Sequence, residues 1–143
     1  MIHELASHPI QLTQDVLWGD LDAYGHVNNT VYFRYFEDAR MAYFERAGVG
    51  EIKQRSNLGP ILARAECDFR LPLQYPDRVC IAVRARLLAP KKIHMDCLVY
   101  SDNSAGIAAE LRGLLLYYDY TAGATCEVPA AVVNVIRQLE SSR

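Results

Sequence analysis

One segment of the chain, residues 30–47, places its apolar side chains with a helical period. Successive apolar positions are separated by four, three, four and four residues, which keeps them on one side of an α-helix: Tyr32, Phe36, Ala39, Tyr43 and Ala47. Asn28 or Asn29 provides a capping side chain at the start, and Gly48 is a residue typical of a helix end. The pattern predicts a helix of about 18 residues, about 27 Å long.

Apolar positions alternate with polar ones, the period of a β-strand, through much of the remaining chain. Val79, Ile81 and Val83, for example, predict a strand with one face in the core and the other partly in solvent. A polar stretch at 101–106 predicts a hairpin loop. The predicted strands cover residues 10–17, 61–71, 79–87, 93–100 and 107–120, and Pro129 begins a short C-terminal helix.

The order of these elements is typical of an α+β fold with an antiparallel sheet. We expect residues 1–143 to form a single domain. The long helix carries more aromatic residues than a surface helix needs, so we expect the five-stranded sheet to curl around it. An open sheet leaves two edges that a protein must cover or pair, and pairing them across a two-fold axis predicts a homodimer with a continuous sheet.

The composition narrows the classes of function. Hydrophobic residues make up 51% of the 143 residues, as in a globular protein. The 15 basic and 17 acidic residues give a net charge of -2, which argues against nucleic-acid binding through phosphates. There is no apolar run of the ~20 residues that a membrane span needs and no secretory leader, so we expect a cytoplasmic protein without membrane association. The four cysteines lack metal-ligand spacing, and we expect reduced thiols and no metal site.

The densest group of polar side chains lies at residues 18–29, between the first strand and the long helix. It contains the carboxylates of Asp20 and Asp22, together with Tyr24, His26 and two asparagines. A helix start can stabilise an oxyanion through unpaired backbone N–H groups, and a nearby carboxylate can act as a nucleophile or as a base for water. The combination suits attack on an acyl carbonyl, but the same residue types also form ordinary capped turns. Residue types alone do not rank one aspartate above the other.

The segment DAYGHVNNTVY at residues 22–32, followed by YFE at 35–37 and AR at 39–40, resembles the signature of hotdog-fold acyl-CoA thioesterases. The resemblance is to the 4-hydroxybenzoyl-CoA thioesterase-like family and extends over nearly the whole chain. It implies a five-stranded antiparallel sheet wrapped around a central helix. It also implies homodimers paired through their sheets, which associate further into homotetramers.

The resemblance also implies roles for single residues in the polar segment. Asp22 matches the catalytic aspartate, and the backbone N–H of Asn29 matches the donor that polarises the thioester carbonyl. His26 matches a position that some branches of the family use in the site. Tyr24 stands where related thioesterases often have an asparagine, and it is a candidate substrate-binding residue.

Further candidate substrate-binding residues are basic or aromatic. Lys91 and Lys92 match the region where the family contacts the nucleotide of coenzyme A, although solvated turn lysines are the alternative interpretation. Two arginines are additional candidates for this role: Arg64 and Arg70. Tyr32 is a candidate for lining the acyl tunnel, as are three other aromatic residues that otherwise belong to the core: Trp18, Tyr35 and Phe36.

The predicted function is hydrolysis of an acyl thioester of coenzyme A or of acyl carrier protein. Asp22 either attacks the carbonyl carbon, giving a mixed anhydride, or takes a proton from water. No cofactor is expected, because coenzyme A is part of the substrate. Two other functions stay open on the sequence alone: a non-catalytic acyl-CoA-binding module, and a hotdog hydratase or dehydratase.

Overall fold

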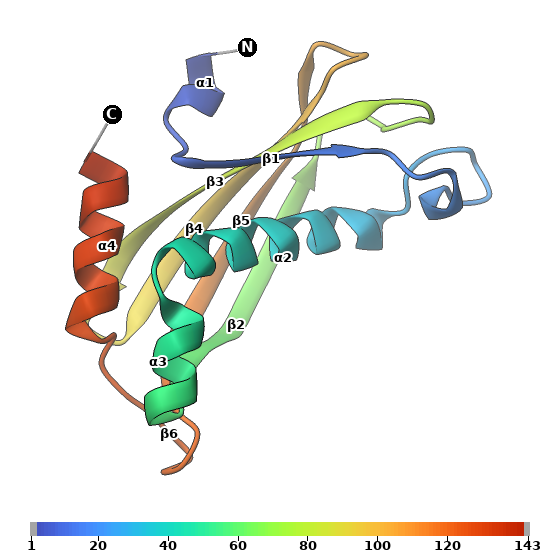
Figure 1. Cartoon of the computed structure of the whole chain (residues 1–143). Coiled ribbons are helices and arrows are strands. Elements are labelled where there is room, and N and C mark those ends of the chain that lie inside the picture. The colour runs from blue at the N-terminus through green and yellow to red at the C-terminus, as the bar shows by residue number, and fades with distance from the viewer. Residues whose placement is uncertain (1–2, 142–143) are drawn as a thin grey trace.

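The helix predicted from the periodicity is the centre of the structure, a computed structural model that describes residues 3–141 (Figure 1). Helix α2 covers Asn29–Arg46, within one residue of the predicted bounds at each end. The side chain of Asn28 caps the helix by accepting a hydrogen bond from the Thr30 backbone N–H. Gly48 follows the helix at a φ of 73°, a left-handed conformation that suits glycine.

A second helix, α3 (Val49–Ser56), follows α2 directly, and the sequence pattern does not predict it. Only Val49 and Ile52 are buried in this helix. Two apolar contacts are too few to produce a recognisable period, so tertiary packing against α2 and β2 stabilises a helix that local signals leave undefined.

The main strands lie in the order β1-β3-β4-β5-β2, and every pair of neighbours is antiparallel. This arrangement confirms the five predicted strands, with β1 and β2 at the two edges of the described sheet. A two-residue strand, β6, pairs with the end of β5 and was absent from the prediction. The bounds are Ile10–Asp15 for β1, Leu58–Phe69 for β2, Arg78–Ala89 for β3, Lys92–Ser101 for β4, Gly106–Asp119 for β5 and Ala124–Thr125 for β6.

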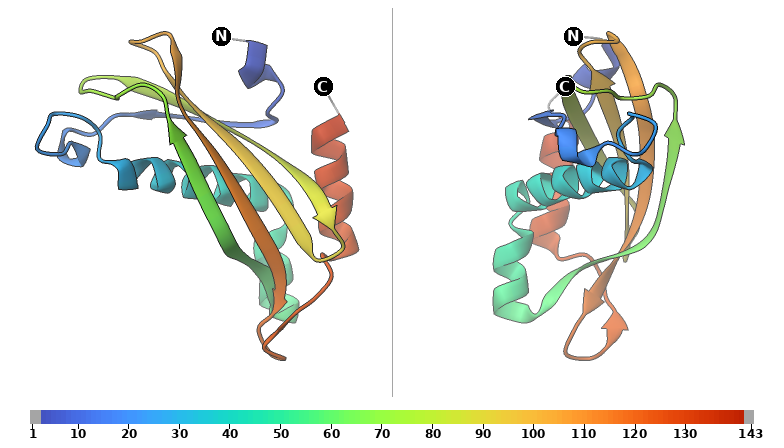
Figure 2. Two further views of the ribbon diagram at one scale, coloured as in Figure 1. Left: turned by 180° about the vertical axis from the view of Figure 1, so that it is seen from behind. Right: turned by 90° about the vertical axis from the view of Figure 1, so that its right-hand side faces the viewer.

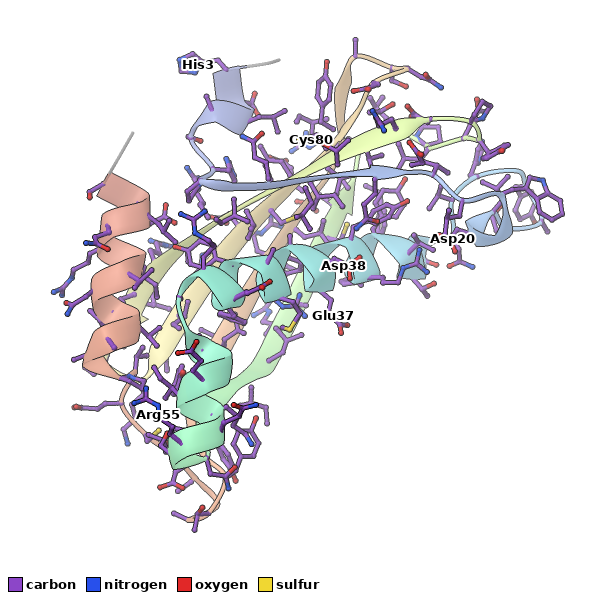
Figure 3. All side chains as sticks on the ribbon, in the orientation of Figure 1. His3, Asp20, Glu37, Asp38, Arg55 and Cys80 are labelled. Carbon is purple, nitrogen blue, oxygen red and sulfur yellow. The ribbon has the colours of Figure 1, made fainter. Side chains whose placement is uncertain are left out.

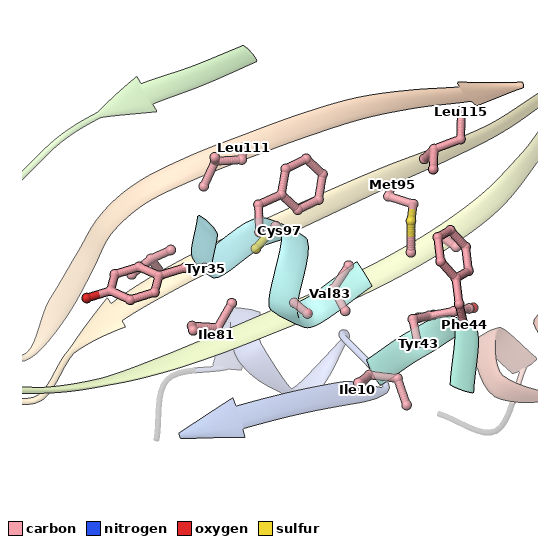
Figure 4. Packing of buried hydrophobic residues seen from close by; sticks show 14 of the residues in the cluster. Ile10, Tyr35, Tyr43, Phe44, Ile81, Val83, Met95, Cys97, Leu111 and Leu115 are labelled. Atoms are coloured by element: carbon pink, nitrogen blue, oxygen red, sulfur yellow. The ribbon is translucent and has the colours of Figure 1, made fainter. Parts of the chain in front are cut away.

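The sheet curls around α2, and the core lies between the helix and the inner face of the strands (Figures 1 and 2). Tyr35, Tyr43 and Met95 are among the buried side chains that fill it (Figure 4). Phe36 is fully buried, and Gly113 on β5 leaves room for its ring, because a Cβ there would lie 2.9 Å from Phe36 Cζ. The protein has the α+β hotdog fold that the resemblance implies.

Helices at the two ends of the chain complete the fold. Helix α4 (Ala130–Ser141) packs against β3, as the short C-terminal helix of the prediction. Helix α1 (His3–Ala6), which the sequence pattern does not predict, lies on the outer face of the sheet. Its Leu5 packs against Ala82 and Leu98 there, so the one turn of helix is held by tertiary contact.

Candidate active site

The chain before α2 forms a tight turn around the side chain of Asp22. Leu21 and Val27 form an isolated antiparallel bridge that closes the turn, and Gly25 occupies its tip at a φ of 78°. The Oδ1 atom of Asp22 accepts the backbone N–H groups of Tyr24 at 2.8 Å and His26 at 3.3 Å. One carboxylate oxygen therefore caps the turn, and within residues 3–141 no partner is seen for Oδ2.

The start of α2 lies directly after this turn. Asn28 uses its side-chain oxygen to accept the Thr30 backbone N–H at 3.0 Å, so it is Asn28 and not Asn29 that caps the helix. Val31 donates its backbone N–H to the Asn28 carbonyl at 2.9 Å. Asn29 is the first helical residue, and no acceptor for its backbone N–H is found in the described part of the chain. This donor is available to a ligand at the positive end of the helix dipole.

A surface hollow of about 420 Å³ joins the turn to the start of α2. The three predicted catalytic residues, the predicted substrate-binding residue Tyr32 and the additional candidate Arg70 contribute to its wall. The remaining lining comes from the turn itself, from the end of β2 and from the chain after β2. The lining residues are Asp22, His26, Val27, Asn29, Tyr32, Phe69, Arg70, Leu71 and Pro72. The structure thus brings together a carboxylate, an imidazole and a helix start on one concave surface.

The two aspartates of the polar segment have different surroundings. Asp20 ends a short 3-10 helix, η1 (Trp18–Asp20), and its carboxylate forms a two-contact ion pair with Arg34 on α2. The carbonyl of Asp20 also accepts the Asn28 backbone N–H at 2.9 Å, which ties η1 to the helix start. Figure 3 shows Asp20 beside the first turn of α2. Asp20 does not line the hollow, and Asp22 does. The geometry separates two carboxylates that residue types alone left equivalent.

Three predicted substrate-binding residues lie outside the hollow of their own chain. Tyr24 projects from the turn and is 86% exposed. Lys91 lies in the turn between β3 and β4, and Lys92 begins β4. At the other end of β3, Arg78 pairs with Asp15, which lies just before the polar segment. The 12 residues of β3 therefore separate these lysines from Asp22 (Figure 1).

The aromatic candidates divide between core and surface. Tyr32 is 3% exposed, yet its edge reaches the hollow, where its ring packs against Phe69 with ring centroids 5.1 Å apart. Tyr35 and Phe36 belong to the core, and burial raises the pKa of the Tyr35 hydroxyl to about 12. Trp18 is 74% exposed and lies outside the core.

The chain after β2 supplies a part of the hollow from which the sequence analysis named only Arg70, as an additional candidate for contacting coenzyme A. Arg70 and Leu71 both donate backbone N–H groups to the Ala108 carbonyl, at 2.8 and 3.1 Å, which fixes this segment on β5. The Arg70 side chain forms an ion pair with Glu110 and places a cation at the wall of the hollow. No spacing signal connects this segment to residues 22–29, since they are more than 40 positions apart in the sequence.

Other classes of site were sought in the same part of the chain. All four cysteines are free thiols. Within residues 3–141 no group of three or more His, Cys, Asp or Glu side chains is placed to hold a metal ion. None of the helices described here has the length and apolar character needed to span a membrane.

Comparison with known protein families matches residues 16–136 to the thioesterase-like superfamily. The chain belongs to this superfamily. The match extends from the polar segment into α4, so it includes the turn, the central helix and most of the sheet. The superfamily takes its name from thioesterases, enzymes that hydrolyse thioesters.

Solved structures of similar proteins agree with this membership. A thioesterase from Thermus thermophilus, solved with coenzyme A and zinc, is 31% identical to this superfamily member, and the match covers 96% of this chain and 98% of that chain with a TM-score of 0.82. A 1,4-dihydroxy-2-naphthoyl-CoA thioesterase from Synechocystis is 16% identical, with coverages of 92% and 97% and a TM-score of 0.82. The protein SAV2348 from Staphylococcus aureus, solved with CoA, is 11% identical, with coverages of 94% and 85% and a TM-score of 0.86. The last two show the shared fold.

Proposed function

We propose that this member of the thioesterase-like superfamily hydrolyses acyl-CoA thioesters, with Asp22 as the catalytic carboxylate. The observation that carries the proposal is the hollow in which Asp22, His26 and Asn29 meet. Oδ1 of Asp22 is held by the turn, so the carboxylate is oriented while Oδ2 is left for chemistry. Coenzyme A bound to the Thermus relative, at 31% identity, supports a CoA thioester as the substrate.

The reaction adds the oxygen of water to the acyl carbonyl carbon and breaks the carbon–sulfur bond. The backbone N–H of Asn29 would donate to the carbonyl oxygen as it gains negative charge. Asp22 Oδ2 either attacks the carbon and expels the thiolate, leaving an anhydride that water hydrolyses, or takes the proton of an attacking water. His26, which lines the same wall, would contact the thioester. Neither route uses a metal or redox cofactor.

The position of the lysines leads us to propose a site built from two chains. Lys91 and Lys92 lie at the far end of the sheet from Asp22 in their own chain, so they reach a nucleotide bound there only from another subunit. Antiparallel pairing of the β2 edges across a two-fold axis turns that end of the partner sheet toward Asp22. We propose a homodimer formed in this way, a dimer of such dimers, and a cytoplasmic enzyme that accepts CoA or acyl carrier protein thioesters. Tyr24 would meet the substrate from the exposed rim.

Substitution of Asp22 by Asn tests the proposal. Asparagine keeps a side-chain oxygen for the Tyr24 and His26 N–H groups, so the turn should persist while the acid–base group is lost. We expect thiol release from acyl-CoA substrates to fall at least about 100-fold. The matched control is Asp20→Asn, two positions away but outside the hollow, which should lower stability through its Arg34 pair and keep activity within a few-fold.

The assay is thiol release from a panel of acyl-CoAs, followed by colour, with each variant checked by circular dichroism. If Asp22→Asn keeps its activity, or if Asp20→Asn loses as much, the assignment of Asp22 is wrong. Tight binding of acyl-CoA without any thiol release by the parent protein would identify a binding module. Hydration of an enoyl-CoA would identify a hydratase.

A further inference from the structure

Three connecting segments meet at one end of the sheet and line a surface groove of about 610 Å³. They are the chain between β1 and η1, the loop between β2 and β3, and the hairpin between β4 and β5 (Figures 1 and 2). The lining of this end groove is residues 15–18, 75–78 and 102–103. The end groove shares no residue with the hollow beside Asp22, so it is a separate feature of the surface.

Large apolar side chains are exposed in the end groove. Trp18, the only tryptophan in the sequence, is 74% exposed, Leu17 is 57% exposed and Tyr75 is 51% exposed. Apolar surface gathered in this way favours association, because a partner that covers it removes it from water. Tryptophan and tyrosine are also enriched among the residues that carry the binding energy of protein interfaces. The end groove therefore has the composition of a contact surface.

The side chain and backbone of Asp77 hold the end groove in shape. Its Oδ2 accepts the Ser101 hydroxyl at 2.6 Å, and its Oδ1 accepts the Asn103 backbone N–H at 3.0 Å. The Asp77 carbonyl accepts the backbone N–H of Val16 at 2.9 Å. One residue thus joins all three segments. A surface that is ordered before binding loses little conformational entropy when a partner arrives.

The end groove carries more negative than positive charge. Its charged residues are three aspartates and Arg78, whose Nε lies 3.1 Å from Asp15 Oδ1. Within residues 3–141 neither Asp77 nor Asp102 forms an ion pair, so two carboxylates are left without a cation. These charges repel an anionic partner and attract a cationic one.

We propose that the end groove binds an arginine-bearing segment of another protein. A guanidinium stacks on the face of a tryptophan or tyrosine ring and also forms paired hydrogen bonds with a carboxylate. It therefore suits both features of the groove: Trp18 or Tyr75 would contact its face, and Asp102 its edge. A lysine ammonium lacks the planar face and is a weaker match.

The exposure of the end groove favours a protein segment over a free organic cation. A small ligand needs a pocket that buries most of its surface. Here the three large apolar side chains are each more than half exposed, so the groove contacts a bound group from one side only. A protein segment gains further contacts along its length. This binding does not require Asp22 to be catalytic, because the hollow takes no part in it.

The fluorescence of Trp18 tests the proposal, because the sequence has no other tryptophan. The probe is the peptide acetyl-Ala-Arg-Ala-Arg-Ala-amide. Its matched control has citrulline, which has nearly the shape of arginine without the charge, in place of both arginines. We expect the arginine peptide to change the Trp18 emission along a saturable curve, and the citrulline peptide to bind at least about fivefold more weakly.

Variants of the end groove locate the binding. Asp102→Asn removes a carboxylate, and Tyr75→Leu replaces an aromatic face with an aliphatic side chain. Each should raise the dissociation constant of the arginine peptide about two- to fivefold, the range for one exposed ion pair or one cation–π contact. The control is Glu127→Gln, an exposed carboxylate next to Val128, whose backbone N–H binds the Pro90 carbonyl beyond the other end of β3. This control should leave binding unchanged.

The outcomes that would overturn the proposal are distinct. Equal binding of the arginine and citrulline peptides would show that the groove does not select a cation, and equal effects of Glu127→Gln and Asp102→Asn would show attraction by net charge alone. Arginine amide that binds as tightly as the peptide would identify a site for a free organic cation. If Tyr75→Leu does not fold by circular dichroism, Trp18→Leu measured by calorimetry should show the same loss, and undiminished binding would overturn the proposal.

Discussion

Asp20 and Asp22 are two residues apart in the chain, but their carboxylates contact different groups. The carboxylate of Asp20 is neutralised by Arg34 and ties η1 to α2. Asp22 uses one carboxylate oxygen to cap the turn, and the residue lines the hollow. The Arg34 contact and the position outside the hollow therefore separate the structural carboxylate from the candidate catalytic one.

Gly113 lies where the core has no room for a side-chain methyl group. A Cβ at this position would approach Phe36 Cζ to 2.9 Å, and Phe36 is fully buried against the sheet. Gly113→Ala should therefore lower the free energy of unfolding by about 1–3 kcal/mol, through overpacking of a ring that has no room to move. Urea denaturation measures the loss.

The control for that substitution is Gly50→Ala on α3. A Cβ at Gly50 meets nothing within 4 Å, and alanine is the better helix residue by about 0.5–1 kcal/mol. Gly50→Ala should leave stability unchanged or raise it. Equal losses from the two variants would show that backbone freedom, and not the space beside Phe36, requires glycine at position 113.

At the scale of elements, helix α4 forms a hydrogen bond with the part of β3 that extends beyond the end of β1. The register of β1 and β3 ends at the pair Ile10 and Val83. The backbone N–H of Ala85, two residues further along β3, therefore has no partner in β1. Glu140 of α4 accepts this N–H at 3.0 Å and the Tyr43 hydroxyl at 2.6 Å. One side chain thus joins the C-terminal helix to both the sheet and the central helix.

Substitution of Glu140 tests whether these two hydrogen bonds stabilise the fold. Glu140→Ala should lower the free energy of unfolding by about 1.5–3 kcal/mol, the range for a hydrogen bond to a charged group. Tyr43→Phe removes the other end of one bond, and the double variant should lose less than the sum of the two single losses. Gln138→Ala, an exposed change on the same helix, is the control. Strict additivity would contradict a direct coupling between Glu140 and Tyr43.

At the scale of the whole molecule, α1 and α4, the first and last helices of the described chain, both pack against β3 (Figures 1 and 2). His8, two residues after α1, is 5% exposed, and its Nδ1 lies 3.0 Å from the Glu4 carbonyl oxygen. The charged groups around it come from β3, β4 and α4: Arg84, Asp96 and Glu140. Burial, followed by the charge of Arg84, lowers the pKa of His8 below its ordinary value of 6.5.

This lowered pKa predicts how stability depends on pH. Just below pH 6.5 the unfolded chain binds a proton at His8 and the folded protein does not, so protonation favours unfolding. The contribution of neutral His8 is complete above that pH and is lost as the pH falls toward the folded-state pKa. The difference in unfolding free energy between the parent and His8→Gln should change across this window. A constant difference from about pH 7.5 to about pH 5 would contradict the assignment.

The sequence by itself determined the features that depend on local order. The helix at Asn29–Arg46 and the five long strands follow from apolar periods of about 3.6 and 2, because each element must bury one face. The segment at 22–32 carried the family resemblance, since its residues are contiguous and their spacing is visible without a fold.

Only the tertiary structure decided which of these residues meet. It paired Asp20 with Arg34, brought Arg70 to the wall beside Asp22, and separated the lysines at 91 and 92 from that wall by the length of β3. It also formed α3 from a segment with two buried residues. These outcomes depend on contacts between positions far apart in the chain, whose energies come from packing and charge in three dimensions and leave no period or spacing in the sequence.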